Sequence, residues 1–355
     1  MPVIQKKHRL HSLDTFRGLT IALMILVNSP GGHAVYPLLE HALWNGCTLA
    51  DLVFPFFLFI VGMSCSLSLS PYTSRTKIFK RSALIFGIGL LLNAFPNHLH
   101  FEQLRLLGVL QRIALCYCAA AFIYLNFDKK AHLILIASIL LGYWGIMVYF
   151  SPEAFTADNN IAALIDRAVL SPMHLYRPTF DPEGLLSTLP AIATTLLGNL
   201  TGLWLREKTT PKIIALRGMM MLFLGLAWSI LCPINKTIWS SSYVLYTGGI
   251  ALVMFALLYW FIDIRKHTSW CVFFDVFGVN ALAAYVLHVF FLKVQAMIFI
   301  TQGTNEAVAL RPYLTQWWFG HMTPANASLL YALSYLLLWF IVLFPLYRHR
   351  IYLKL

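Results

Sequence analysis

The side chain in this sequence that is best suited to proton transfer is His41. An imidazole exchanges a proton near neutral pH, so histidine often serves as a general base. His41 follows the segment 28–32, Asn-Ser-Pro-Gly-Gly, and precedes the segment 44–46, Trp-Asn-Gly. The chain contains twelve histidines, with His33 nearby, so an ordinary interface histidine is the alternative. Residue type alone does not separate the two roles.

Arg112 is the ionisable residue that is hardest to reconcile with its apolar surroundings. It follows Gln111 inside an apolar run over residues 106–126. A buried guanidinium requires an anionic partner, because an unpaired charge is costly in a medium of low dielectric constant. The sequence leaves three partners open, which are Asp14, Asp51 and a phosphate group of a ligand.

Two acidic residues and one arginine stand at the starts of apolar runs. Asp14 and Arg17 are three residues apart and share one helix face. One interpretation is that they form a pair at the start of the helix. The other is that Arg17 binds a phosphate group. Asp51 comes three residues after Thr48. One interpretation is that Asp51 caps the start of the helix. The other is that its carboxylate pairs with His41 or Arg112.

Asn280 and His288 are two polar residues inside a further apolar run, over residues 273–294. Their spacing of eight residues places them close to one face of a continuous helix. Two polar groups on one face indicate the wall of a cavity. Hydrogen bonds between helices in a membrane are an equally good explanation.

These residues must be positioned by apolar helices. Hydrophobic residues make up 59% of the 355 and charged residues 11%, with a mean hydropathy of +0.72. Soluble proteins contain about 25% charged residues, so a lipid bilayer is the expected surrounding. We therefore predict an all-α, polytopic integral membrane protein with about ten transmembrane helices. The expected spans are 14–29, 50–70, 82–96, 106–126, 131–150, 185–205, 213–232, 243–263, 273–294 and 328–347.

The positive charges predict the orientation of these spans. The net charge is +12, yet the cations occur in short groups between apolar runs, so no nucleic-acid partner is expected. With the N-terminus inside, most Lys and Arg residues fall on the cytoplasmic side, as the positive-inside rule requires. Both termini are then cytoplasmic. The exceptions on the outer side are Arg105, Arg167, Arg177, Lys236, Lys293 and Arg311.

Residues 1–355 are expected to form a single transmembrane domain. Its long connections, at about 30–49, 151–183 and 295–327, all fall on the outer side in this topology, whereas most inner connections are short. Loop residues concentrated on one face indicate that the protein acts there.

Four segments resemble one known family. They are 12–18 (Ser-Leu-Asp-Thr-Phe-Arg-Gly), 44–55 (Trp-Asn-Gly-Cys-Thr-Leu-Ala-Asp-Leu-Val-Phe-Pro), 108–112 (Gly-Val-Leu-Gln-Arg) and 181–186 (Asp-Pro-Glu-Gly-Leu-Leu). The pattern is similar to the transmembrane heparan-α-glucosaminide N-acetyltransferases and their bacterial relatives, which are linked to amino-sugar metabolism. The resemblance extends from about residue 9 to 350.

The resemblance implies an acetyltransferase that takes acetyl-CoA from the cytoplasmic side and delivers the acetyl group to a glucosamine amine outside. It implies that His41 is the active histidine and Asn28 its companion. His41 would act as base or as transient acetyl carrier. Asn28 would orient it or donate a hydrogen bond to the oxyanion. No metal is expected.

The remaining polar residues are assigned by their chemistry. Arg17, Gln111 and Arg112 are expected to hold the phosphates of coenzyme A, since arginine suits phosphate geometry. The residues expected at the substrate or in the cavity wall are Asp14, Asp51, Asn280 and His288.

The family resemblance also suggests a homodimer. The lysosomal members carry a lumenal domain before the first core helix, which is not seen here, so a bacterial inner membrane is expected. The rival hypothesis is an amino-sugar transporter. Five spans would precede the 151–183 loop and five would follow it, and inverted repeats need an odd number in each half. The two halves show no similarity to one another.

Overall fold

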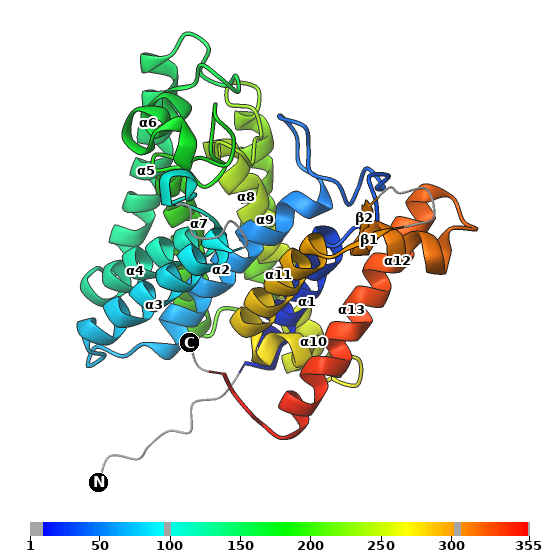
Figure 1. Ribbon diagram of the computed structural model, residues 1–355. Helices are drawn as coiled ribbons and strands as arrows, with labels where there is room; N and C mark the ends of the chain where they lie inside the picture. The colour runs from blue at the N-terminus through cyan, green and yellow to red at the C-terminus, as the bar shows by residue number, and fades with distance from the viewer. Residues whose placement is uncertain (1–9, 96–100, 302–306, 354–355) are drawn as a thin grey trace.

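The computed structural model describes residues 10–95, 101–301 and 307–353. In these ranges the chain forms an all-α bundle with one short antiparallel hairpin, and Figure 1 shows their arrangement. The helices are α1 (His11–Asn28), α2 (Leu49–Ser68), α3 (Arg75–Ala94), α4 (Val109–Asn126), α5 (Lys129–Phe150), α6 (Ile161–Leu170), α7 (Thr188–Arg206), α8 (Pro211–Trp228), α9 (Ser241–Leu258), α10 (Cys271–Val279), α11 (Ala281–Met297), α12 (Leu310–Phe319) and α13 (Pro324–Arg348).

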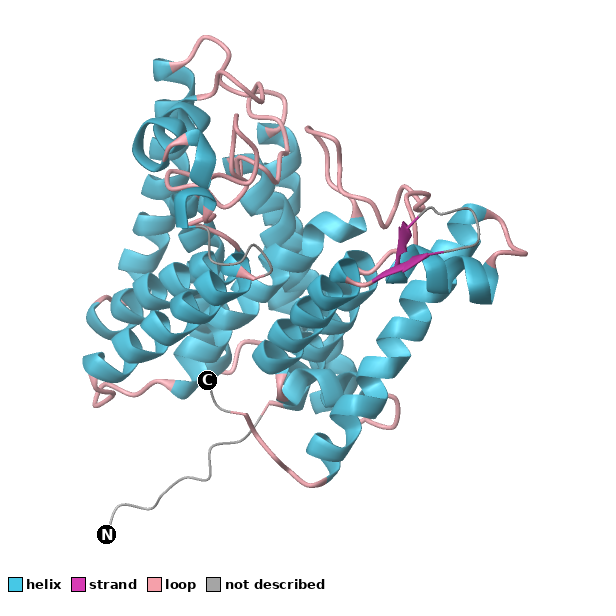
Figure 2. Cartoon of the chain, viewed as in Figure 1, coloured by secondary structure: helices cyan, strands magenta, loops and turns pink. Residues whose placement is uncertain are grey.

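Short elements complete the fold, as Figure 2 shows by secondary structure. The hairpin pairs β1 (Phe299–Thr301) with β2 (Ala307–Ala309). Two 3₁₀ turns, η1 (Phe101–Gln103) and η2 (Pro172–His174), lie in connections. A π-helical stretch, η3 (Tyr259–Ile264), extends α9. The hairpin and α12 occupy the third long connection, which the sequence did not predict to be structured.

The protein is a polytopic membrane protein. Six of the described helices are long and apolar enough to cross a bilayer, namely α2, α4, α5, α8, α9 with η3, and α13. The bent pair α10 and α11 would make a seventh span. Helices α1, α3 and α7 also lie in segments that we expected to span. In α7 several polar side chains are buried inside the bundle, where they do not contact lipid, including Thr194, Thr195 and Asn199.

The prediction of one continuous helix over 273–294 is wrong. The chain breaks at Asn280, and the axes of α10 and α11 differ by 81°. The Asn280 side chain donates to the carbonyl of Ile351 and accepts from the amide of Leu353. Asn280 therefore ties the break to the C-terminal segment, and it does not share a helix face with His288.

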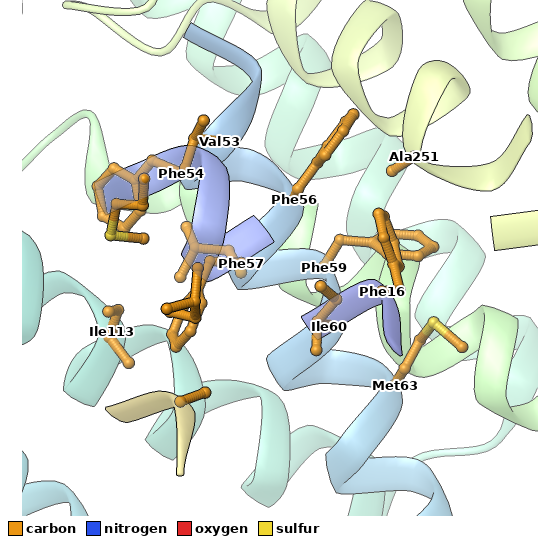
Figure 3. Packing of buried hydrophobic residues seen from close by; sticks show 14 of the residues in the cluster. Phe16, Val53, Phe54, Phe56, Phe57, Phe59, Ile60, Met63, Ile113 and Ala251 are labelled. Carbon is orange, nitrogen blue, oxygen red and sulfur yellow. The ribbon is translucent and has the colours of Figure 1, made fainter. Parts of the chain in front are cut away.

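Helix α2 lies at the centre of the bundle and packs closely on α7. A Cβ atom on Gly62 would lie 1.8 Å from the carbonyl oxygen of Thr195, and one on Gly198 would lie 2.0 Å from that of Phe59. Small residues let membrane helices approach this closely. On other faces of α2 the core is aromatic, and the ring centres of Phe16 and Phe56 are 5.5 Å apart. Figure 3 shows these side chains among their neighbours.

We expect Gly62→Leu to abolish the native packing of α2 on α7. No rotamer of leucine removes the contact of its Cβ with the Thr195 backbone, so the cost exceeds the roughly 1–3 kcal/mol typical of overpacked cores. The measurement is the yield of monodisperse protein in detergent and its melting temperature. Gly142→Leu is the control, because a Cβ at Gly142 meets open space. Equal stability of the two variants would contradict this account.

The start of α1 and the end of α13 lie at the same end of the bundle (Figure 1). The connection that contains α6 lies at the opposite end, together with the segment between α1 and α2. This arrangement places the two longest connections before α7 on one face.

Candidate active site

A cavity of about 390 Å³ opens beneath these connections. Its walls come from the end of α1, the α1–α2 connection, the start of α2, the segment before α4, helix α11 and two loops that are remote in sequence. We call it the outer cavity. Its polar and aromatic lining residues are Asn28, His41, Trp44, Asp51, Phe54, Arg105, Tyr176, Glu183, Lys236, Thr237 and Tyr285.

His41 is held in this cavity by Asp51. The imidazole Nδ1 lies 2.8 Å from one carboxylate oxygen of Asp51. The other carboxylate oxygen accepts from the Ala42 amide at 3.1 Å, the Thr48 amide at 3.0 Å and the Thr48 hydroxyl at 3.1 Å. Asp51 thus caps α2 and also binds His41, so two roles that the sequence offered as alternatives occur together.

This pairing determines which nitrogen of His41 can act as a base. An ionised carboxylate only accepts hydrogen bonds, so Nδ1 carries the proton that bonds to Asp51. Nε2 then keeps its lone pair. A carboxylate that orients a histidine in this way is the arrangement found in catalytic triads. The side chain of His41 is half exposed, so a molecule in the cavity can reach it.

Lys236 adds a positive charge beside this pair. Its Nζ lies 3.1 Å from Nδ1 and 3.3 Å from Nε2 of His41, and 3.5 Å from Asp51. Burial lowers the pKa of Lys236, although the charges of Asp51 and Glu183 oppose that shift. In the sequence, Lys236 stands out only as a positive charge on the expected outer side, because no motif around it indicates contact with His41.

A second ionic network contributes Arg105 and Glu183 to the wall of the outer cavity. Arg105 donates to both oxygens of Asp181, at 2.9 and 2.6 Å, and to Glu183 at 2.5 Å. Its guanidinium also lies 4.8 Å from the centre of the Tyr176 ring. Burial alone would lower the pKa of Arg105, but the two acidic partners raise it overall. The segment 181–186 drew attention as a motif, whereas Arg105 had no sequence signal beyond its charge.

Asn28 lies at the end of α1 and lines the same cavity as His41. Among the described residues, its side-chain amide makes no hydrogen bond. It is therefore available to a molecule bound in the cavity. The structure thus brings Asn28, His41 and Asp51 together.

A cavity of about 400 Å³ lies toward the other end of the bundle, and we call it the inner cavity. Arg17 lines it and donates to the Ser64 hydroxyl at 2.9 Å and to Asp14 at 3.2 Å. Arg81 also lines it, with its guanidinium 5.0 Å from the centre of the Tyr117 ring. Two cations around one cavity favour an anionic ligand.

A third cavity, of about 550 Å³, adjoins the inner one, because Val279 and Tyr352 line both. Asp14, Arg348 and Arg350 also line this third cavity. Asn280 lines the inner cavity, as expected of a residue in a cavity wall. It does so from the break between α10 and α11 and not from the side of a continuous helix.

The outer and inner cavities approach each other along α2. Phe54 lines the outer cavity and Phe57 lines the inner one. Three residues of helix rise correspond to about 4.5 Å. On α4, Val109 lines the outer cavity and Ile113, four residues later, lines the inner one. About one helical turn therefore separates the two sets of lining residues.

Gln111 and Arg112 lie outside the cavities described here. Arg112 is fully buried and donates to the Gly184 carbonyl at 3.1 Å and the Ser187 hydroxyl at 2.5 Å. Its guanidinium lies 5.1 Å from the centre of the Trp239 ring. The expectation that Arg112 pairs with Asp14 or Asp51 is wrong, because those carboxylates bind Arg17 and His41. Arg112 instead joins α4 to the start of α7.

Gln111 and His288 are also buried inside the bundle. The Gln111 side chain packs against Gly89 and Gly108, which leave room for it. His288 is fully buried, and its Nδ1 bonds to the Ala284 carbonyl of its own helix at 3.0 Å. Neither residue lines a described cavity, so a ligand-binding role for them has no geometric support.

Comparison with known proteins identifies similar sequences. A family model described as "Heparan-alpha-glucosaminide N-acetyltransferase, catalytic" matches residues 9–230. The human and mouse heparan-alpha-glucosaminide N-acetyltransferases are each 30% identical to the chain over 353 residues of alignment, which covers 79% of it. The alignment covers 52% of the human protein and 53% of the mouse protein. The chain spans about half the length of these relatives.

Proposed function

Because the chain belongs to the heparan-alpha-glucosaminide N-acetyltransferase catalytic family, we propose that it transfers the acetyl group of acetyl-CoA to the amine of a glucosamine-type sugar. The observation that carries this proposal is the His41–Asp51 pair, in a cavity whose wall lies about one helical turn from the inner cavity. A donor from one side and an acceptor from the other would meet between them.

The acceptor binds in the outer cavity in this proposal. Trp44 and Tyr176 offer aromatic faces to a sugar ring, and Glu183 offers a carboxylate to its ammonium group. His41 Nε2 removes a proton from the amine, which attacks the thioester carbonyl. The Asn28 amide donates to the oxyanion that forms. The carbon–nitrogen bond replaces the carbon–sulfur bond, and the proton passes to the departing thiol of coenzyme A.

The donor enters from the inner side. The phosphates of coenzyme A would meet Arg17 and Arg81 in the inner cavity, with Arg348 and Arg350 in the adjoining one. Of the three residues that the sequence suggested for coenzyme A, Arg17 keeps this role, whereas Gln111 and Arg112 lie away from the cavities described above.

Removal of either inner-cavity arginine tests this donor site. We expect Arg17→Ala and Arg81→Ala each to weaken acetyl-CoA binding by about ten-fold or more, since a hydrogen bond to a charged group contributes about 1.5–3 kcal/mol. Calorimetry on detergent-solubilised protein measures the affinity. Arg75→Ala is the control, because Arg75 on α3 is exposed and bonds to Asn126. If all three variants bind as the unmodified protein does, the donor site lies elsewhere.

The expected topology divides the two sides of the membrane in the same way. We propose about ten crossings with both termini cytoplasmic, because each expected span contains a helix and the cations favour that side. Reporter tags before α1 and within the connection that contains α6 test it, and they should report opposite sides. The bacterial inner membrane and the homodimer remain predictions.

The decisive experiment supplies acetyl-CoA and glucosamine to the purified protein in liposomes. Formation of N-acetylglucosamine that requires acetyl-CoA supports the proposed function. Uptake of glucosamine without acetyl-CoA, and without acetylated product, would overturn it in favour of the transporter hypothesis.

A further inference from the structure

We propose that Lys236 is itself an acetyl acceptor, so that the protein acetylates this lysine from bound acetyl-CoA when no sugar occupies the outer cavity. This inference rests on the proposed function, because it uses the same donor and the same base. It adds a site of covalent self-modification to the outer cavity.

The position of the Lys236 amine is the first support. Its Nζ lies 3.3 Å from Nε2 of His41, the nitrogen assigned as the base, and 3.1 Å from Nδ1, so the amine lies against the imidazole ring. A primary amine this close to the base can pass a proton to it after a rotation of the lysine or histidine side chain, as the sugar amine must also do. Lys236 and the sugar therefore compete for the same position beside His41.

The loop that carries Lys236 is fixed, which is the second support. Within the loop, Asn235 accepts from the Ile238 amide at 3.1 Å. The loop is also bonded to the segment that carries His41, through Asn235 to Asn45 at 3.1 Å and Gly46 to the Ile234 carbonyl at 2.7 Å. These two bonds hold together the two segments that carry the amine and the base, which raises the effective concentration of one at the other.

The surroundings of Lys236 favour its reaction. Only 20% of the side chain is exposed. Burial lowers its pKa, against the opposing charges of Asp51 and Glu183, and so increases the fraction of neutral amine. A desolvated lysine is a recognised nucleophile in enzymes.

The reaction balances without a further reactant. The Nζ attacks the thioester carbonyl carbon, its proton passes to His41, and the carbon–sulfur bond breaks. The proton then reaches the departing sulfur, which leaves as the thiol of coenzyme A. The amide product has lost the positive charge beside Asp51 and remains in the cavity. We therefore expect the modified protein to transfer acetyl groups to sugar more slowly.

Lys293 provides a matched control on the same expected side of the membrane. Its Nζ donates to the carbonyls of Leu92 and Phe95, at 2.6 and 2.7 Å. It lines none of the three cavities described above, and both of these hydrogen bonds are to backbone carbonyls, which are not bases. It should not be acetylated.

The test incubates the purified protein with acetyl-CoA alone and locates the added acetyl group by peptide mass spectrometry. We expect a hydroxylamine-stable acetyl group on Lys236, absent from Lys293 and absent in His41→Ala. Transfer to glucosamine is then measured with and without this incubation. The incubation should slow the unmodified protein and Lys293→Arg, but it should not slow Lys236→Arg relative to its own unincubated rate.

Two results overturn the proposal in different ways. If glucosamine is acetylated while Lys236 stays unmodified, or if the label lies on His41 and is released by hydroxylamine, self-acetylation of Lys236 fails and the proposed function stands. If neither the lysine nor the sugar is acetylated, both proposals fail.

Discussion

His41→Ala is expected to lower the rate of acetyl transfer by about 10²–10⁴-fold, the usual contribution of a positioned general base. The affinity for acetyl-CoA should stay close to that of the unmodified protein, because His41 lines the outer cavity and not the inner one. The measurements are the initial rate of N-acetylglucosamine formation and calorimetric binding of acetyl-CoA. Together they separate loss of chemistry from loss of donor binding.

His33→Ala is the matched control for this variant. His33 lies in the same connection, is exposed, and does not line the outer cavity. It should transfer acetyl groups at the unmodified rate. If His41→Ala does so as well, His41 is neither the base nor the acetyl carrier.

Asp51→Asn is expected to cause a loss of similar size, about 10²–10⁴-fold, through the tautomer of His41. One carboxylate oxygen of Asp51 receives three donors, from Ala42 and Thr48. An asparagine satisfies these donors only with its carbonyl oxygen, so its NH₂ group faces His41. The imidazole must then accept at Nδ1 and carry its proton on Nε2. That tautomer cannot remove a proton from an amine.

The initial rate and its pH profile check this prediction. Asparagine also caps helices well, so α2 should still begin at the same residue and the protein should still fold. Asp128→Asn is the control, because Asp128 caps α5 through the Ala131 amide and lies outside the described cavities. An Asp51→Asn protein with the unmodified rate and pH profile would exclude the assigned role of the His41–Asp51 pair.

The sequence by itself determined the class of protein. The apolar runs and low charge predict a polytopic all-α membrane protein, and that prediction is confirmed. This follows because a backbone in lipid must satisfy its hydrogen bonds within each helix. The motifs at 12–18, 44–55 and 108–112 also indicated the family, and the match over residues 9–230 confirms it. The motif that contains Asp51 lies only three residues after His41, so their contact was foreseeable as one of several alternatives.

Only the tertiary structure decided which distant residues share a cavity. Lys236 reaches His41 across 195 positions of the chain, and Arg105 reaches Asp181 across 76. No local spacing encodes such contacts, because they depend on how the helices pack. The same packing turns Arg112 toward α7, although an arginine inside an apolar run has the same sequence signal whether it binds a ligand or a carbonyl. The break at Asn280 likewise brings its side chain to a partner 71 residues away, the carbonyl of Ile351.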